Sequence, residues 1–330
     1  MEWDVVIVGS GFGGSVSALR MAEKGYRVLV VEQGRHVSQD DLAAAGEDPK
    51  RLLRMPALGL RQGFFAQEVY RHVSLVRGIA VGGGSVVWAA VMLEPKQAFY
   101  DDPAWSRLPR RDWRHELAPH YATASRMLGL TSNPRQTQQD QWLRETAREL
   151  GVEDSYGSVT QAIFFGDAER EQADPFFGGA GPSRRGCTFA RVVPPAARRA
   201  PRTRWTRIIC IWRRALARRS WLNAGFNASR RWVALLGLSP GIDASLGCQR
   251  VPPQTLTASK VIVAAGVVGT LELLLACRDR YRTLPNLSPA LRAARTHQQR
   301  EHSAGDRTRS TTDVSDGATI SAISTSAPRT

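Results

Sequence analysis

The sequence predicts an α/β fold in which a parallel β-sheet is wound with helices. Three observations support this prediction: a glycine-rich turn between a strand and a helix within residues 4–32, a triple glycine at 82–84, and a late apolar strand followed by a small-residue turn at 260–266. A chain of 330 residues is long enough to form one large domain or two. Its composition, 42% hydrophobic and 23% charged, is that of a soluble globular protein.

The first segment reads as strand, turn, helix and strand. Val5 to Val8 is a β-branched run typical of a strand that is buried on both faces, and residues 27–31 repeat this pattern before Glu32. Helix formers lie between the two runs and end at Gly25, where we expect a C-cap. The turn that opens this helix has the spacing Gly-x-Gly-x-x-Gly, with glycines at Gly9, Gly11 and Gly14.

Each of these residues has a physical reason to be there. Gly9 permits the tight turn, Gly11 lets the backbone approach a pyrophosphate, and Gly14 allows close packing of the helix on the strand. The N–H groups at the start of the helix attract phosphates. Glu32 stands where a carboxylate accepts hydrogen bonds from ribose hydroxyls. The segment therefore predicts dinucleotide binding, and the alternative is a glycine-rich turn that only packs on its own sheet.

Two further segments separate the possible dinucleotides. Residues 77–95 read RGIAVGGGSVVWAAVMLEP, in which bare N–H groups of three glycines would lie near a flat or anionic ligand; an ordinary glycine-rich loop is the alternative. Residues 254–278 contain a buried-type strand at 260–264, a turn at 265–266 and a helix at 270–277. We expect this late strand to return to the first sheet and to bring small residues beside the cofactor.

Four blocks of the sequence together resemble the glucose–methanol–choline (GMC) oxidoreductases, and within them the bacterial cholesterol oxidase-like branch. The blocks are DVVIVGSGFGGSVSALRMAEKGYRVLVVEQG, GIAVGGGSVVWAAVMLEP, DPFFGGAGPSRRGCT and VIVAAGVVGTLELLLACRDRYRTLPNLSP. The resemblance implies a Rossmann-type FAD-binding domain with an interleaved, incomplete substrate domain. It also implies noncovalent FAD, which takes hydride from the CH–OH group of a bulky alcohol or sterol and passes electrons to O2 or another acceptor.

The resemblance assigns cofactor contacts by motif position. The residues implied at the ADP half and its turn are Gly9, Ser10, Gly11, Phe12, Gly14 and Glu32. Those implied at the flavin side are Gly83, Ser85, Trp88 and Ala89, with Ala265 and Gly266 nearby.

The sequence departs from the family in the catalytic histidine. Members of the family carry this His, with an Asn or His partner, in the C-terminal third of a longer chain. None of the six histidines matches that position; they are His36, His72, His115, His120, His297 and His302. We therefore assign no catalytic residue, and we expect the chain to lack the catalytic region and to be inactive as it stands.

The net charge of +15 is concentrated in one segment. From residue 175 to 242 there are fourteen Arg and no Asp, Glu or Lys. Residues 200–212 read APRTRWTRIICIW, at a place where the family continues with a sequence of the type AKNTLxxNYLxLA. A DNA sequence that encodes APRTRWTRIICIW can also encode AKNTLDKNYLYLA when it is read two nucleotides later. We infer that the chain is out of frame from about Ala190 to Pro240, and again after about Leu291.

Two other functions compete with the flavoprotein. Clustered Arg with interleaved aromatic side chains can bind single-stranded nucleic acid through phosphate contacts and stacking. The Arg of this segment, however, follow no consistent helical face and no RNA-binding signature accompanies them, so we expect no nucleic-acid partner. An NAD-dependent dehydrogenase is the other alternative, and the GGGS and AAG blocks speak against it.

We expect five segments along the chain. They are the first part of the FAD-binding domain (1–95), a helical lid and substrate region (96–189), a poorly packed Arg/Trp-rich segment (190–240), the return to the FAD-binding domain (241–291) and a disordered tail (292–330).

The remaining signals concern metals and location. The cysteines Cys187, Cys210, Cys248 and Cys277 form no Cys-x-x-Cys pair and no Cys/His cluster, so we expect neither a metal site nor a disulfide framework. No run of eighteen apolar residues predicts a transmembrane helix. The N-terminus has no basic region and no cleavage site of a signal peptide, so the expected compartment is the cytoplasm.

Overall fold

The computed structural model describes ten stretches of the chain, which fall into two compact units. The described residues are 3–70, 73–103, 112–176, 183–187, 189, 221–223, 225–229, 233–237, 254–292 and 321–323. The first unit combines Met1–Val87 with Trp205–Thr312, and the second combines Trp88–Arg204 with Asp313–Thr330. The N-terminal part of the first unit ends at Val87, and the five expected segments stay predictions.

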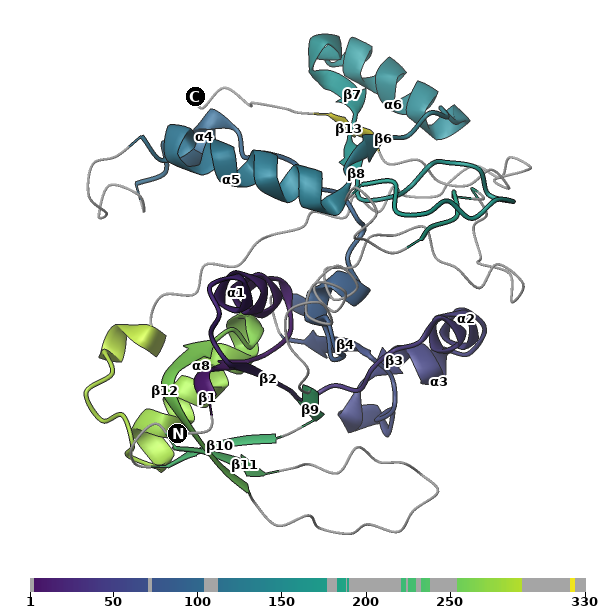
Figure 1. Cartoon of the computed structure of the whole chain (residues 1–330). Coiled ribbons are helices and arrows are strands. Elements are labelled where there is room, and N and C mark those ends of the chain that lie inside the picture. The colour runs from purple at the N-terminus through teal and green to yellow at the C-terminus, as the bar shows by residue number, and fades with distance from the viewer. Residues whose placement is uncertain are drawn as a thin grey trace. The chain divides into compact units, whose positions relative to one another are not determined.

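A six-stranded sheet forms the centre of the first unit, in the order β10-β11-β12-β1-β2-β9 (Figure 1). Four neighbouring strands are parallel: β12 (Gln254–Val263), β1 (Trp3–Val8), β2 (Val28–Glu32) and β9 (Trp221–Asn223). The hairpin of β10 (Gly225–Ser229) and β11 (Val233–Gly237) extends the sheet with antiparallel pairing. The late strand β12 thus returns to the first sheet, as the sequence predicted, and it pairs there with β1.

The register brings three strand ends together. Val8 lies opposite Val263 of β12 on one side and opposite Val31 of β2 on the other. Because these strands run in the same direction, the turns that follow them leave the sheet at one edge. Ligands of open parallel sheets bind at such carboxyl edges.

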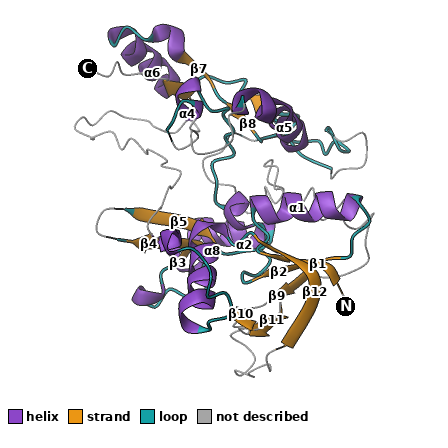
Figure 2. Cartoon of the chain, turned by 90° about the vertical axis from the view of Figure 1, so that its left-hand side faces the viewer, coloured by secondary structure: helices purple, strands orange, loops and turns teal. Residues whose placement is uncertain are grey.

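Alternation along β1 and β2 supplies a core on both faces of the sheet. Val5, Ile7 and Val30 pack against helix α1 (Phe12–Glu23), which lies along one face (Figure 2). The opposite face buries Val6, Leu29 and Val31 together with residues of β12. Each fully buried aliphatic side chain contributes about 1.5–3 kcal/mol. The sheet is therefore a stable base for the turns at its edge.

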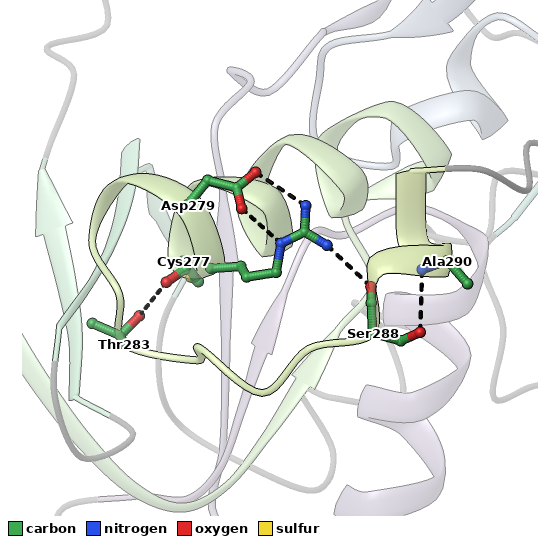
Figure 3. A network of polar contacts seen from close by, with 6 residues as sticks. Cys277, Asp279, Thr283, Ser288 and Ala290 are labelled. Carbon is green, nitrogen blue, oxygen red and sulfur yellow. Dashed lines mark hydrogen bonds and ion pairs between the residues drawn. The ribbon is translucent and has the colours of Figure 1, made fainter.

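Helix α8 (Gly266–Leu275) follows β12 and ends in a π-helical turn at Ala276–Arg280. Here the guanidinium of Arg278 donates to the carboxylate of Asp279 at 2.7 and 3.1 Å and to the carbonyl of Ser288 at 3.0 Å. The hydroxyl of Thr283 donates to the carbonyl of Cys277 at 3.3 Å (Figure 3). These contacts fasten the chain after α8 to the end of the helix.

A smaller layer of the first unit carries the triple glycine. It contains the helices α2 (Gln39–Glu47) and α3 (Pro49–Leu52), the short 3-10 helices η1 (Pro56–Leu58) and η2 (Gly83–Val86), and the strands β3 (Leu53–Arg54), β4 (Phe65–Val69) and β5 (Ser74–Gly78). Its own core is formed by Val37, Ala45, Phe64, Ala80 and Val86. This core packs η2, and with it the glycines, against Ala45 of α2 and against Phe64, which precedes β4.

The second unit contains the predicted helices of the lid region. Its elements are α4 (Gln97–Tyr100), α5 (Trp113–Leu128), α6 (Gln138–Glu149), the 3-10 helix η4 (Glu153–Ser155), and the short strands β6 (Thr131–Ser132), β7 (Tyr156–Ser158), β8 (Thr160–Gln161) and β13 (Ser321–Ile323). Gly129 and Gly151 have φ values of 63° and 67° at the ends of α5 and α6. They close these helices in the left-handed conformation, which glycine adopts easily.

Several predictions fall on residues outside the described part. Within 190–240 only the backbone of β9, β10 and β11 is described, and within the expected tail after residue 292 only β13. The out-of-frame hypothesis therefore stays a prediction. Cys187 and Cys277 are free thiols, whereas Cys210 and Cys248 lie outside the described residues. Among the described helices, none combines the length and the apolar character needed to cross a membrane.

Candidate functional site

The turns after β1 and β12 are joined by backbone hydrogen bonds to the ends of the neighbouring strands β2 and β1. The N–H of Gly9 donates to the carbonyl of Val31 at 2.8 Å, and the N–H of Ala264 donates to the carbonyl of Val8 at 2.8 Å. The first residue of the turn after β1 is therefore bonded to β2, and the first residue of the turn after β12 is bonded to β1. This arrangement brings the first and the third of the predicted glycine and alanine segments together.

Two glycines of the first turn are required by space. A Cβ on Gly14 would lie 1.9 Å from the carbonyl oxygen of Gly9, and a Cβ on Gly9 would lie 2.4 Å from the carbonyl oxygen of Ala264. Gly9 also has a φ of +97°, which side chains rarely adopt. The start of helix α1 consequently lies in direct contact with Gly9, and Gly9 lies in direct contact with Ala264 of the turn after β12.

Gly11 differs, because a Cβ placed on it would meet no atom within 4 Å. It is the N-cap of α1, no side chain caps this end, and no acid stands in the first helical turn. Backbone N–H groups at such an end attract anions, and open space beside the cap is what a pyrophosphate requires. The residues present therefore fit the phosphates of a dinucleotide.

The triple glycine packs on the first turn, backbone against backbone. A Cβ on Gly83 would lie 2.9 Å from Cα of Gly11, and a Cβ on Gly84 would lie 3.4 Å from the ring of Phe12. Gly82 and Gly83 have positive φ values of 107° and 52°. The second predicted segment thus joins the other two at the same edge of the sheet.

Glu32 is buried at the end of β2 and is held by three protein donors. Its Oε2 accepts from the N–H of Ser10 at 2.9 Å and from the hydroxyl of Ser10 at 2.6 Å, and its Oε1 accepts from the N–H of Gly34 at 2.8 Å. A carboxylate oxygen can accept two hydrogen bonds. Oε2 is therefore fully used, while Oε1 keeps one acceptor position suited to a ribose hydroxyl.

The loop of the triple glycine is anchored on its other side through Arg35. The N–H of Val81 donates to the carbonyl of Arg35 at 3.0 Å, and the guanidinium of Arg35 pairs with Asp41 at 2.8 Å. This guanidinium, helped by hydrogen bonds from Ser38, lowers the pKa of Asp41 to about 2. Asp41 and Ser38 form the capping box that starts α2, so the loop is tied to a stable helix end.

The other predicted site residues lie in different surroundings. Ser85 is buried, and its hydroxyl donates to the carbonyl of Gly82 at 2.8 Å, within its own loop. Ala265 is the N-cap of α8, and Gly266 follows with open space around it. Trp88 and Ala89 belong to the second unit, where Trp88 is buried and Ala89 is exposed. Their expected place at the flavin side stays a prediction.

Sequence reasoning missed three contributors to these contacts. Gly34 donates to Glu32, and a Cβ on it would lie 2.3 Å from the backbone nitrogen of Ala80. Ala264 lines the space beside Gly9 and Gly14. Gly82 donates its N–H to the hydroxyl of Ser10 at 2.9 Å. A glycine two residues after a strand-end acid was a usable signal for Gly34, whereas nothing local in the sequence indicates the contact of Gly82.

In the described part of the chain, this edge of the sheet contains neither a buried histidine nor a group of metal ligands. His36, His115 and His120 are exposed, and His72, His297 and His302 fall outside the described residues. In the same described part, no group of three or more His, Cys, Asp or Glu is arranged to hold a metal ion.

Comparison with known proteins gives one domain family and several relatives. Residues 4–47 match the family described as "FAD binding domain". A cholesterol oxidase of Mycobacterium tuberculosis is 36% identical over 306 residues, which cover 88% of this chain and 50% of that protein. A cholesterol oxidase of Acinetobacter baumannii is 39% identical over 191 residues (57% of this chain, 34% of that protein). The long-chain-alcohol oxidase FAO1 of Arabidopsis thaliana is 38% identical over 96 residues (29% and 12%).

The chain therefore spans about half the length of the mycobacterial relative. The matched domain, residues 4–47, contains β1, the glycine turn, α1 and β2, which are the elements that build the phosphate and ribose positions described above. The description of the matched domain indicates FAD as the dinucleotide. The chain is therefore similar to cholesterol oxidases and, at residues 4–47, to an FAD binding domain, which agrees with the resemblance of its sequence motifs to GMC oxidoreductases.

Proposed function

We propose that this chain serves the oxidation of the CH–OH group of a bulky alcohol or sterol, with FAD held at the edge formed by the turns after β1, β2 and β12. The observation that carries the proposal is that these turns meet the triple glycine in one place. There, the start of α1 has no side-chain cap and the carboxylate of Glu32 is buried. The substrate class is supported by the relatives, which are named as oxidases of cholesterol and of long-chain alcohols.

In this proposal the backbone of the first turn binds the pyrophosphate. The start of α1 at Gly11 offers N–H groups and a partial positive charge, and Oε1 of Glu32 accepts a ribose hydroxyl. Gly83 and Gly84, together with Ala265, keep side chains away from the flavin. When bound, the flavin supplies the capacity to accept hydride from an alcohol carbon, and electrons leave to O2 or another acceptor.

The protein's remaining task is to orient the alcohol and to accept its hydroxyl proton. We assign no residue of this chain to that base, because the described histidines are exposed. We accordingly propose that FAD binding, rather than alcohol oxidation, is the property of this chain to measure first.

The experiment is a titration of purified, flavin-free protein with FAD, followed by quenching of flavin fluorescence and by retention of yellow colour after gel filtration. Parallel titrations with NADH and with a labelled oligonucleotide serve as comparisons. Saturable binding of FAD supports the proposal. Retention of the nicotinamide coenzyme without FAD, or salt-sensitive binding of the oligonucleotide alone, would contradict it.

A further inference from the structure

Ser10, between the first two glycines of the turn, is completely buried, and each of its polar groups has a protein partner. Its N–H donates to Oε2 of Glu32 at 2.9 Å, and its carbonyl accepts from the hydroxyl of Ser15 at 2.6 Å. Its own hydroxyl donates to Oε2 of Glu32 at 2.6 Å and accepts from the N–H of Gly82 at 2.9 Å. The side chain is therefore engaged inside the protein rather than turned toward a ligand.

This one hydroxyl connects three segments that are distant in the sequence. The serine lies after β1, the carboxylate of Glu32 ends β2, and Gly82 opens the loop of the triple glycine, 72 residues along the chain from Ser10. The first bond holds Oε2 of Glu32 in place and so fixes the direction of Oε1. The second bond holds the loop whose Gly83 packs on Gly11. Both parts of the proposed cofactor site therefore depend on the same side chain.

An alanine at this position would leave one buried group without a partner and remove one of the two hydrogen bonds of another. The N–H of Gly82 would lose its acceptor, and Oε2 of Glu32 would lose a short, charge-assisted hydrogen bond. A buried donor without an acceptor favours any rearrangement that returns it to water. The expected rearrangement is a loop of the triple glycine that leaves its place on the first turn for part of the time.

We propose that Ser10 is a positioning residue, which sets the loop at Gly82 and the carboxylate of Glu32 for FAD without touching FAD itself. The proposal rests on the cofactor site proposed above. A site that is correctly formed in only a fraction of molecules binds its ligand more weakly by that fraction. Loss of the Ser10 hydroxyl should thus weaken FAD binding although no cofactor contact is removed.

The test compares Ser10→Ala with Ser15→Ala in the full chain. Ser15 is a matched control, because it is also completely buried and its hydroxyl also donates one hydrogen bond of 2.6 Å, which goes to the backbone carbonyl of Ser10 and which Ser10→Ala leaves in place. Two quantities are measured: hydrogen exchange of the Gly82 amide in FAD-free protein, relative to the amide of Ile7 in β1, and the Kd for FAD. Normalising to Ile7 removes any general loss of stability.

For Ser10→Ala we expect Gly82 to exchange about 10- to 100-fold faster relative to Ile7, and the Kd for FAD to rise by a similar factor, which corresponds to the loss of one buried hydrogen bond to a charged network. Ser15→Ala should change both quantities by less than about threefold. Ser10→Cys keeps a side chain of similar size with a weak donor and should give intermediate values, which preserves the test if the alanine variant does not fold.

Equal exchange of the Gly82 amide in wild type and in both Ser10 variants would show that the Ser10 hydroxyl does not hold this loop, and would overturn the proposal. Faster exchange with an unchanged Kd would overturn the positioning role, and so would an equal rise of the Kd in Ser15→Ala. A wild-type protein that binds no FAD would overturn the proposed function itself, and that outcome is recognised because the unsubstituted chain already fails to bind.

Discussion

Gly14→Ala is the substitution that examines the architecture of the site most directly. The added Cβ would lie 1.9 Å from the carbonyl oxygen of Gly9, whereas Cβ atoms essentially never approach another atom closer than 3.0 Å. Helix α1 would have to move away from β1 by more than 1 Å. It would thereby leave the buried contacts of Ala18 with Val5 and Ile7.

Overpacking of this kind costs about 1–3 kcal/mol. For a unit of this size, that loss lowers the Tm by about 2–4 °C per kcal/mol. The displaced helix start also carries the phosphate position, so we expect FAD binding to weaken at least tenfold. Thermal unfolding followed by circular dichroism, together with FAD titration of the folded variant, measures both effects.

Gly46→Ala in α2 is the matched control, because a Cβ on Gly46 would meet no atom within 4 Å. Replacement of a helical glycine by alanine should raise stability by about 0.5–1 kcal/mol and leave FAD binding unchanged. If Gly14→Ala has the stability and the FAD affinity of the wild type, the close approach of α1 to the strand turns is not a property of this protein.

The remaining predictions concern other parts of the first unit. Glu32→Gln replaces one carboxylate oxygen by an amide NH2, which then faces at least one backbone N–H donor, either that of Gly34 or that of Ser10, so FAD affinity should fall about tenfold and stability by about 1–3 kcal/mol; unchanged urea unfolding and FAD titration curves would contradict this. Arg35 lowers the pKa of Asp41 from 3.8 to about 2, so its stabilisation is complete above pH 4 and is lost as the pH falls from 4 toward 2. Asp41→Asn should lower stability at pH 7 by about 1 kcal/mol and flatten that pH dependence in urea unfolding series. Arg278→Ala removes the bonds to Asp279 and Ser288, so limited trypsin digestion should cleave residues 281–292 faster than in the wild type.

The elements with strong local patterns could be predicted from the sequence. The run Val5 to Val8 and the glycine spacing predict β1 and the start of α1, and Gly129 and Gly151 end their helices by a conformation that glycine adopts easily. The return of β12 to the first sheet was also predictable, because a late strand of buried type needs a place in a parallel sheet.

The start of β12 was harder to predict. The strand begins at Gln254 rather than at Lys260, because its first half alternates between buried Leu256 and Ala258 and exposed Thr257 and Ser259. A search for continuous apolar runs does not detect this period of two. This first half pairs with β11, so the half-buried alternation reflects its place next to the antiparallel hairpin.

The hydrogen bonds of the site could not be predicted. A serine inside a glycine turn has no periodicity that marks it, and its acceptor role toward Gly82 depends on a loop that folds back from much later in the chain. The same holds for Gly34, whose close approach to Ala80 exists only after the smaller layer has formed. Long-range polar contacts of this kind follow from the assembled backbone and not from local sequence.

The central position of β1 has a consequence for the order of events on the ribosome. β1 pairs with β2 early in synthesis, but its other neighbour, β12, emerges only after residue 254. During that interval one side of a strongly apolar strand presents unsatisfied backbone groups, which is a template for unwanted association between nascent chains. We therefore expect the first 87 residues, expressed alone, to aggregate and to stay bound to chaperones. Co-expression with residues 254–292 should reduce this aggregation.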